Sequence, residues 1–141
     1  MKRTLSFILA IAMVVSFCTC FSLNASAETY VAEIDGTQYT SIQAAVDAVT
    51  AGQTITLLTD FEDGGVKVPS GKEFTLDFAG HTLTVGTPLV GSTGTETNGF
   101  QLLKDSTITM KNGTITTTTA KILIQNYSNL TLQDMTLDGS Q

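Results

Sequence analysis

The chain has 141 residues, with 13 acidic and 7 basic side chains and a formal net charge of −6 at pH 7. Nucleic acids and anionic membrane surfaces are bound by clustered lysine and arginine, so this balance argues against both as partners. The charges are dispersed along the chain, as on the solvated surface of a globular domain.

Residues 1–27 have the pattern of a secretory signal peptide. Lys2 and Arg3 precede an apolar run at 7–15, and the segment closes with the small-residue motif Ala25-Ser26-Ala27. Polar residues interrupt the apolar stretch before it reaches the ~20 residues that a membrane span needs. We therefore expect cleavage after Ala27 and a secreted or cell-surface protein without a membrane span.

Cleavage would remove both cysteines, Cys18 and Cys20, and two of the seven basic residues. The remaining chain would carry five basic against thirteen acidic residues, a net charge of −8, and no arginine. Because it would have no cysteine for a disulfide, it must be held together by its core and by backbone pairing.

Residues 28–53 are expected to form a strand near Tyr30–Ile34 and one short amphipathic helix over 41–51. Apolar side chains recur at helical spacing within this helix, namely Ile42, Ala45, Val46 and Val49. Thr40 followed by Gln43 has the spacing of a capping box, and Gly52 suits the C-terminal cap.

Residues 54–141 alternate aliphatic and polar side chains, which is the strand period of two. They also repeat at a spacing of 22 residues, which relates Ile108, Met110, Asn112 and Ile115 to Leu130, Leu132, Asp134 and Leu137. An earlier copy occupies 74–84, with two more residues between its halves, and 87–99 is typical of a loop inserted after it.

A repeat of this length is too short to bury its own apolar side chains, so its copies must stack as coils. Stacking pairs each strand with the coils above and below and collects equivalent aliphatics into interior columns. Crossover connections between parallel strands are right-handed. The pattern therefore predicts a mainly β fold, a right-handed parallel β-helix with an N-terminal strand and a short capping α-helix.

Four segments carry a resemblance to a known family: YTSIQAAVDAV (39–49), GQTITLLTD (52–60), VPSGK (68–72) and LDFAGHTL (76–83). Together they resemble the opening of the pectin-lyase-like β-helix domains of secreted and cell-surface proteins of Gram-positive, often gut-dwelling, bacteria. The resemblance implies that the strand and helix cap the coil and that coils are added from Ile55 onward. It implies no particular activity, because this architecture carries lyases, hydrolases, adhesins and plain spacers.

The two ends of such a solenoid are expected to differ. An uncapped end presents unpaired backbone groups. The helix can close the first end, whereas the chain stops at Gln141 directly after a coil. We expect the sequence to be truncated there, or its open C-terminal coil to pair with further coils or with another chain.

Two features could carry metal or nucleophilic chemistry. His81 is the only histidine, so it cannot build a histidine cluster, and it stands in a turn motif that favours a structural role. Asp60, Glu62 and Asp63 could offer oxygen ligands to calcium. Their spacing matches no EF-hand loop, so a solvated turn is the favoured interpretation.

Asp134 and Asp138 could form a carboxylate pair for glycoside hydrolysis, but any acidic β-helix offers such pairs. A pectate-lyase mechanism needs a cationic or strongly basic group beside calcium-binding carboxylates. Beyond Ala27 the chain has no arginine, and its five lysines are scattered. No residue is therefore assigned a catalytic, cofactor-binding or metal-binding role, and no cofactor is expected.

Threonine pairs at 82–84, 107–109 and 114–116 place two hydroxyls on one face of each strand. Stacked pairs of this kind could form a flat ice-binding array. The next coil offers Thr136-Leu137-Asp138 instead, and threonine favours strands in any case, so a strand-forming role is the preferred interpretation.

The export signal, the coil repeat and the missing catalytic residues together indicate a non-catalytic β-helical module of a secreted or cell-wall-associated bacterial protein. Such a module would act as a scaffold, a spacer or an adhesive surface. The alternative is the N-terminal fragment of a carbohydrate-active β-helix enzyme, a polysaccharide lyase or glycoside hydrolase with its groove on later coils. A carbohydrate-binding module is a third hypothesis, and a polysaccharide or a host or cell-wall glycan is the expected partner.

Overall fold

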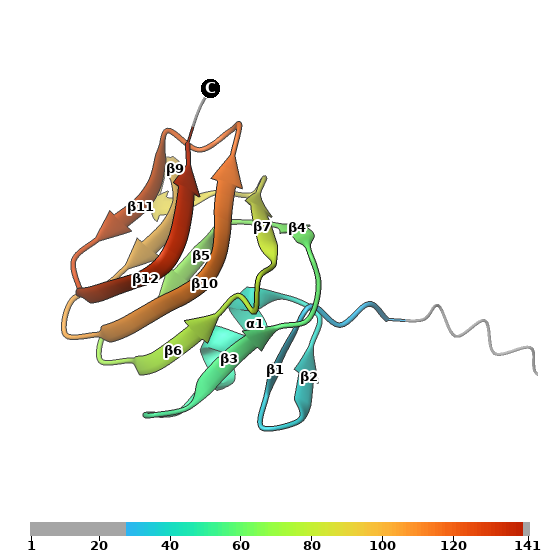
Figure 1. Cartoon of the computed structure of the whole chain (residues 1–141). Coiled ribbons are helices and arrows are strands. Elements are labelled where there is room, and N and C mark those ends of the chain that lie inside the picture. Colours follow the sequence, from blue (N-terminus) through green and yellow to red (C-terminus); the bar gives the residue numbers. More distant parts are fainter. Residues whose placement is uncertain (1–27, 140–141) are drawn as a thin grey trace, which may run out of the picture.

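A computed structural model describes residues 28–139. Within them the chain is mainly β with one helix, α1, which confirms that part of the prediction (Figure 1). The expected signal peptide, 1–27, and both cysteines lie outside the described residues. No helix in the described part of the chain is long and apolar enough to cross a membrane.

The strands form two sheets, whose longest ladders are parallel. In the larger sheet, β3 (Thr54–Leu57), β6 (Glu73–Asp77), β10 (Thr107–Thr117) and β12 (Asn129–Asp138) lie side by side. The second half of β10 also pairs with β7 (Thr82–Val85), which pairs in turn with β4 (Phe61–Asp63). The smaller sheet holds β5 (Val66–Val68), β9 (Thr95–Leu102) and β11 (Ile122–Asn126). Successive strands of the chain thus return to the same three positions in the two sheets.

The pairing of β10 with β12 confirms the predicted repeat. Its nine residue pairs all have a spacing of 22, including Ile108 with Leu130 and Ile115 with Leu137. The earlier copy of the repeat lies in β6, which pairs with β10 on the side opposite β12 and places Phe74 beside Ile108. The segment expected to be a loop is instead largely a hairpin, because β8 (Val90–Ser92) pairs antiparallel with the start of β9.

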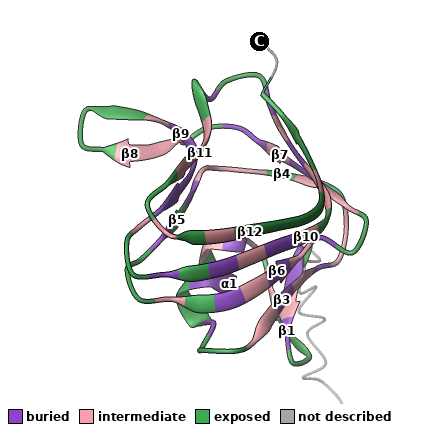
Figure 2. Ribbon diagram, turned by 60° about the vertical axis from the view of Figure 1, so that its left-hand side comes forward, coloured by how far each residue is buried: buried purple, intermediate pink, exposed green. Residues whose placement is uncertain are grey.

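Inward-facing side chains form columns, because the pairs fix equivalent residues above one another. One column runs through Ile55, Leu76, Met110 and Leu132. The first three are at most 1% exposed, whereas Leu132 at the top is 43% exposed. Figure 2 shows the same change, with buried stretches along β6 and β10 and an exposed β12. The buried core therefore extends along the stacked strands β3, β6 and β10, and its side chains become exposed at β12.

A corner divides β10 and β12 into two arms. Asn112 and Asp134 stand at equivalent places in the repeat and both adopt a left-handed conformation, with φ of 61° and 51°. Asparagine and aspartate tolerate this conformation better than most residues. The next residue in β10, Gly113, has no room for a side chain, because a Cβ there would collide with Phe78.

The N-terminal elements differ in detail from their prediction. Helix α1 spans Ile42–Ala48, with Ser41 as its N-cap and Val49 as its C-cap. The predicted caps, Thr40 and Gly52, are therefore wrong. The backbone of Ser41 is extended, which lets its Oγ accept a hydrogen bond from the Ala44 N–H at 3.1 Å. Gly52 lies in the turn beyond the helix, with φ of 81°.

The expected strand at 30–34 is shorter and belongs to a hairpin. Strand β1 (Ala32–Ile34) turns at Asp35 and Gly36 into β2 (Thr37–Tyr39), with which it pairs antiparallel. Both turn residues have positive φ, 48° and 82°, as a tight hairpin turn requires.

Candidate functional site

His81 and Asp60 form a structural link rather than part of a larger cluster. His81 Nδ1 lies 3.1 Å from Asp60 Oδ1, and the same oxygen accepts a hydrogen bond from the Thr82 N–H at 2.8 Å. The Thr82 N–H and then the His81 ring hold the pKa of Asp60 below its ordinary value. The pair connects the start of β7 to the turn before β4.

The acidic cluster predicted at 60–63 is divided among separate tasks. Asp63 Oδ2 accepts a hydrogen bond from the Ile42 N–H at 3.0 Å, and Asp63 Oδ1 accepts one from the Gly64 N–H at 2.8 Å. Asp63 therefore fixes the start of α1, while Asp60 faces His81. The described residues hold no group of three histidine, cysteine or acidic side chains that could bind a metal ion.

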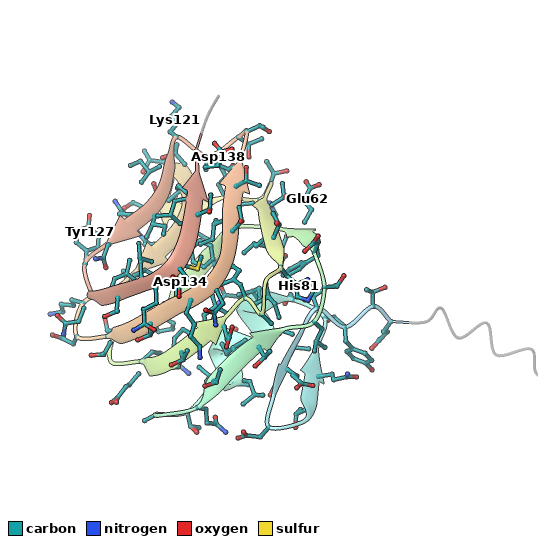
Figure 3. All side chains as sticks on the ribbon, in the orientation of Figure 1. Glu62, His81, Lys121, Tyr127, Asp134 and Asp138 are labelled. Carbon is teal, nitrogen blue, oxygen red and sulfur yellow. The ribbon has the colours of Figure 1, made fainter. Side chains whose placement is uncertain are left out.

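The candidate carboxylates for glycoside hydrolysis lie apart on the surface (Figure 3). Asp134 and Asp138 are four residues apart on β12, which is up to about 13 Å along a strand. Glu62 and Asp138 share a column, but Thr84 and Thr116 stand between them, so about 14 Å of sheet separates the two. Paired glycosidase carboxylates lie roughly 5–9.5 Å apart.

Asp77 interacts with three donor groups at the corner of β6. Lys111 Nζ lies 3.1 Å from Asp77 Oδ2, while Asp77 Oδ1 accepts from the Ala79 N–H at 2.9 Å and from Asn112 Nδ2 at 3.1 Å. Burial raises the pKa of Asp77, but these three donors outweigh it and hold the pKa below its ordinary value. The group ties the corner of β6 to the corner of β10.

The longest threonine column differs from the predicted pairs. Thr54, Thr75, Thr109 and Thr131 stack across four strands of the larger sheet. Beside two of them the outer surface is hollowed by about 120 Å³, and the lining residues are Gly52, Glu73, Phe74, Thr75, Thr107 and Thr109. A shallow hollow lined by hydroxyls and one carboxylate has groups that can hydrogen-bond a polar ligand.

The end of the stacked strands at β3 and β5, called the lower end below, is closed by contacts that the sequence analysis did not predict. Strand β1 pairs antiparallel with β3, and below β5 the amide of Gln43 takes the place of a strand. Its Nε2 donates to the Lys67 O at 3.0 Å, and its Oε1 accepts from the Lys67 N–H at 2.8 Å. Lys72 Nζ then donates to the Val49 O at 2.8 Å, at the end of α1. No local pattern indicates these contacts, because they join residues more than 20 positions apart.

The opposite end, at β12, is called the upper end, and it has no comparable closure within the described residues. Strand β12 pairs with β10 alone, and the far side of β12 is an edge of the sheet. Leu132 and Leu137 are 43% and 41% exposed there, although both point toward the core. Ile122 on β11 is also 43% exposed. A sheet edge that carries exposed aliphatic side chains can pair with a further strand.

Comparisons with models of protein families, with curated proteins and with solved structures find no match to this chain. The resemblance to pectin-lyase-like domains therefore depends on its four sequence segments and stays a prediction.

Proposed function

We propose that the chain beyond Ala27 forms a right-handed parallel β-helix and serves as a non-catalytic module of a secreted or cell-wall-associated bacterial protein. The module acts as a scaffold, a spacer or an adhesive surface. The observation that carries the proposal is the pairing of β10 with β12, in which nine pairs keep one spacing of 22 residues. A constant spacing is what stacked coils of one length produce.

Three further observations support the stacked-coil architecture. The ladders β4–β7 and β5–β9–β11 are also parallel, so each face of the coil has its own pairing. Parallel strands of one sheet are joined by right-handed crossovers in nearly all proteins, which supports the handedness. The hairpin and α1 lie at the first coil, where a solenoid needs a cap.

The non-catalytic role is supported by what the polar side chains do. His81, Asp60, Asp63 and Asp77 are engaged with backbone N–H groups or with neighbouring strands, and Lys72 binds the end of α1. These contacts fix corners and caps. These five side chains therefore have structural partners within the described part of the chain.

The activity test is incubation of the purified protein with polygalacturonate, pectin and a panel of plant and bacterial polysaccharides. We expect neither new reducing ends nor unsaturated uronate products. Reproducible cleavage that persists through successive purification steps and is lost in the Asp138→Asn or Glu62→Gln variant would overturn the proposal. Gln38→Glu, on the exposed strand β2, serves as the control substitution.

The alternative, an N-terminal part of a carbohydrate-active β-helix enzyme, is favoured by one observation. The hollow beside Thr75, Thr107 and Thr109 lies on the outer face of the sheet and includes the carboxylate of Glu73. If it is a sugar subsite, titration with oligosaccharides should shift the amide resonances of these four residues. The Thr109→Val variant should lose those shifts, whereas Thr118→Val, at an exposed position outside the hollow, should retain them.

A further inference from the structure

The hollow on the outer face of the larger sheet is lined by polar side chains that the fold does not use. It measures about 120 Å³. Its polar side chains are those of Glu73, Thr75, Thr107 and Thr109. Within the described residues, neither the Glu73 carboxylate nor the three hydroxyls have a hydrogen-bond or ion-pair partner. The hollow therefore presents one carboxylate and three hydroxyls to a ligand.

The backbone fixes the walls of the hollow. The Gly52 N–H donates to the Glu73 O at 3.1 Å, and the Thr75 N–H donates to the Gln53 O at 3.0 Å, so the turn after α1 is tied to β6. The parallel ladder between β6 and β10 holds Thr107 beside Glu73. The groups that face a ligand are thus held in place before it arrives, which lowers the cost of binding.

The lysines on the neighbouring strands do not neutralise the Glu73 carboxylate. Lys72 Nζ donates to two carbonyl oxygens at the end of α1, the shorter contact being 2.8 Å. Lys111 Nζ lies 3.1 Å from Asp77 Oδ2. A ligand that carries a carboxylate would be repelled by Glu73, whereas a ligand that carries an ammonium group would gain an ion pair.

An amino sugar combines the groups that match this hollow. Its hydroxyls donate and accept hydrogen bonds, as threonine hydroxyls do, and its ammonium offers donors to a carboxylate. A calcium ion matches less well, because it takes about six to eight oxygen ligands. Glu73 is the one carboxylate among the lining residues of the hollow.

The threonine column continues the hollow along the stack. Thr54 lies beside Thr75 on one side, and Thr131 lies beside Thr109 on the other. Neighbouring strands are ~4.8 Å apart, which is close to the length of one residue in an extended β-1,4-linked sugar chain. A chain laid across the strands would therefore meet one threonine per strand. Because this face is lateral, coils stacked on either end leave it uncovered.

We propose that the hollow binds sugars with a free amine, such as a β-1,4-linked glucosamine oligomer. Glu73 pairs with the ammonium group, and Thr75, Thr107 and Thr109 hydrogen-bond the sugar hydroxyls. The outer face of the larger sheet is then the adhesive surface of the module, so the inference rests on the proposed function. Acetylation of the amine weakens binding, and uronate sugars do not bind at this site.

Titration of the isotope-labelled protein tests the class of ligand. The ligands are oligomers of equal length of β-1,4-linked glucosamine, of β-1,4-linked N-acetylglucosamine and of α-1,4-linked galacturonate. We expect the glucosamine oligomer to shift the amide resonances of Glu73, Thr75, Thr107 and Thr109. The N-acetylated oligomer should bind about fivefold more weakly or worse, and the galacturonate oligomer should leave these resonances unchanged. Equal affinity for the first two ligands, or the same shifts from calcium chloride alone, overturns the proposal.

Substitutions separate the site from the general attraction of an acidic protein for a cationic ligand. Glu73→Gln should weaken binding of the glucosamine oligomer about fivefold at low salt and remove most of its salt dependence. Glu96→Gln, in the hairpin of β8 and β9, removes the same charge and keeps an acceptor for the Gly94 N–H, so it should bind like wild type. Both glutamates are exposed, and circular dichroism checks that both variants fold. Equal weakening in the two variants overturns the proposal.

The site and the proposed function fail separately. A chain that binds none of these sugars and cleaves no polysaccharide is still a scaffold or spacer, so only the site is lost. A chain that binds the glucosamine oligomer and also cleaves a polysaccharide keeps the site and loses its non-catalytic role.

Discussion

The closure of the lower end by Gln43 gives a quantitative prediction. Gln43→Ala removes two hydrogen bonds to the backbone of Lys67, one donated at 3.0 Å and one accepted at 2.8 Å. Hydrogen bonds of this kind contribute about 0.5–1.5 kcal/mol each, and alanine returns a few tenths through its helix propensity. We expect the free energy of unfolding to fall by about 1–2.5 kcal/mol, or roughly 4–10 °C in Tm.

The assay is urea unfolding followed by circular dichroism, with amide hydrogen exchange as a local probe. The Lys67 amide should lose protection in Gln43→Ala by at least as much as the global stability falls. Gln43→Glu should be no more stable than alanine, because its carboxylate cannot donate to the Lys67 O and would face Asp47 Oδ1, to which the Gln43 amide donates at 2.9 Å. Gln38→Ala, at an exposed position of β2, is the matched control and should change stability by less than about 0.5 kcal/mol. If Gln43→Ala matched this control, the side chain would not be closing the edge.

Three further predictions concern the corner, a buried hydroxyl and acid. Gly113→Ala should lower stability by about 3 kcal/mol in urea unfolding, because its Cβ would collide with Phe78, and folding at wild-type stability would contradict this close approach. Thr117→Val should cost about 2 kcal/mol, since the buried Thr117 Oγ1 donates to the Val85 O at 2.8 Å and accepts from the Ala120 N–H at 3.0 Å, whereas Thr118→Val, on an exposed side chain, should cost little. The lowered pKa of Asp77 stabilises the fold above the unfolded-state value of 3.8, and this contribution is lost as pH falls through the folded pKa. Melting curves of wild type and Asp77→Asn should therefore differ at pH 7 and converge as pH falls below 3.8, and a constant difference would contradict the assignment.

The repeat could be predicted because a strand alternates its faces with a period of two. Once Ile108 and Leu130 occupy equivalent positions, every residue between the corners has a fixed face and a fixed neighbour. The corner could be predicted in part, since Asn112 and Asp134 occur at one place in the repeat and both tolerate positive φ. The handedness and the family resemblance are not decided by this register.

The N-terminal details could be predicted less well, for identifiable reasons. Thr40 and Ser41 are neighbouring residues that can both act as N-caps, and the choice depends on which of them has extended backbone when the helix docks. The hairpin of β1 and β2 has a signal in the sequence, the Asp35-Gly36 dipeptide between two short alternating segments. The bidentate contact of Gln43 had none, because it exists only after β5 has reached the helix.

The two ends of the stacked strands differ in whether they can accept a further strand. At the lower end, β1 and Gln43 satisfy the backbone of β3 and β5, and α1 buries Ile42 and Val46 against the core. At the upper end, the last members of the same interior columns are exposed, and the strand that carries them is a sheet edge within the described residues. A second strand placed there would complete both the ladder and the core, while the same strand would find no unpaired edge of β3 below. Within the described residues, the backbone positions that can accept a further strand therefore lie at the β12 end of the larger sheet.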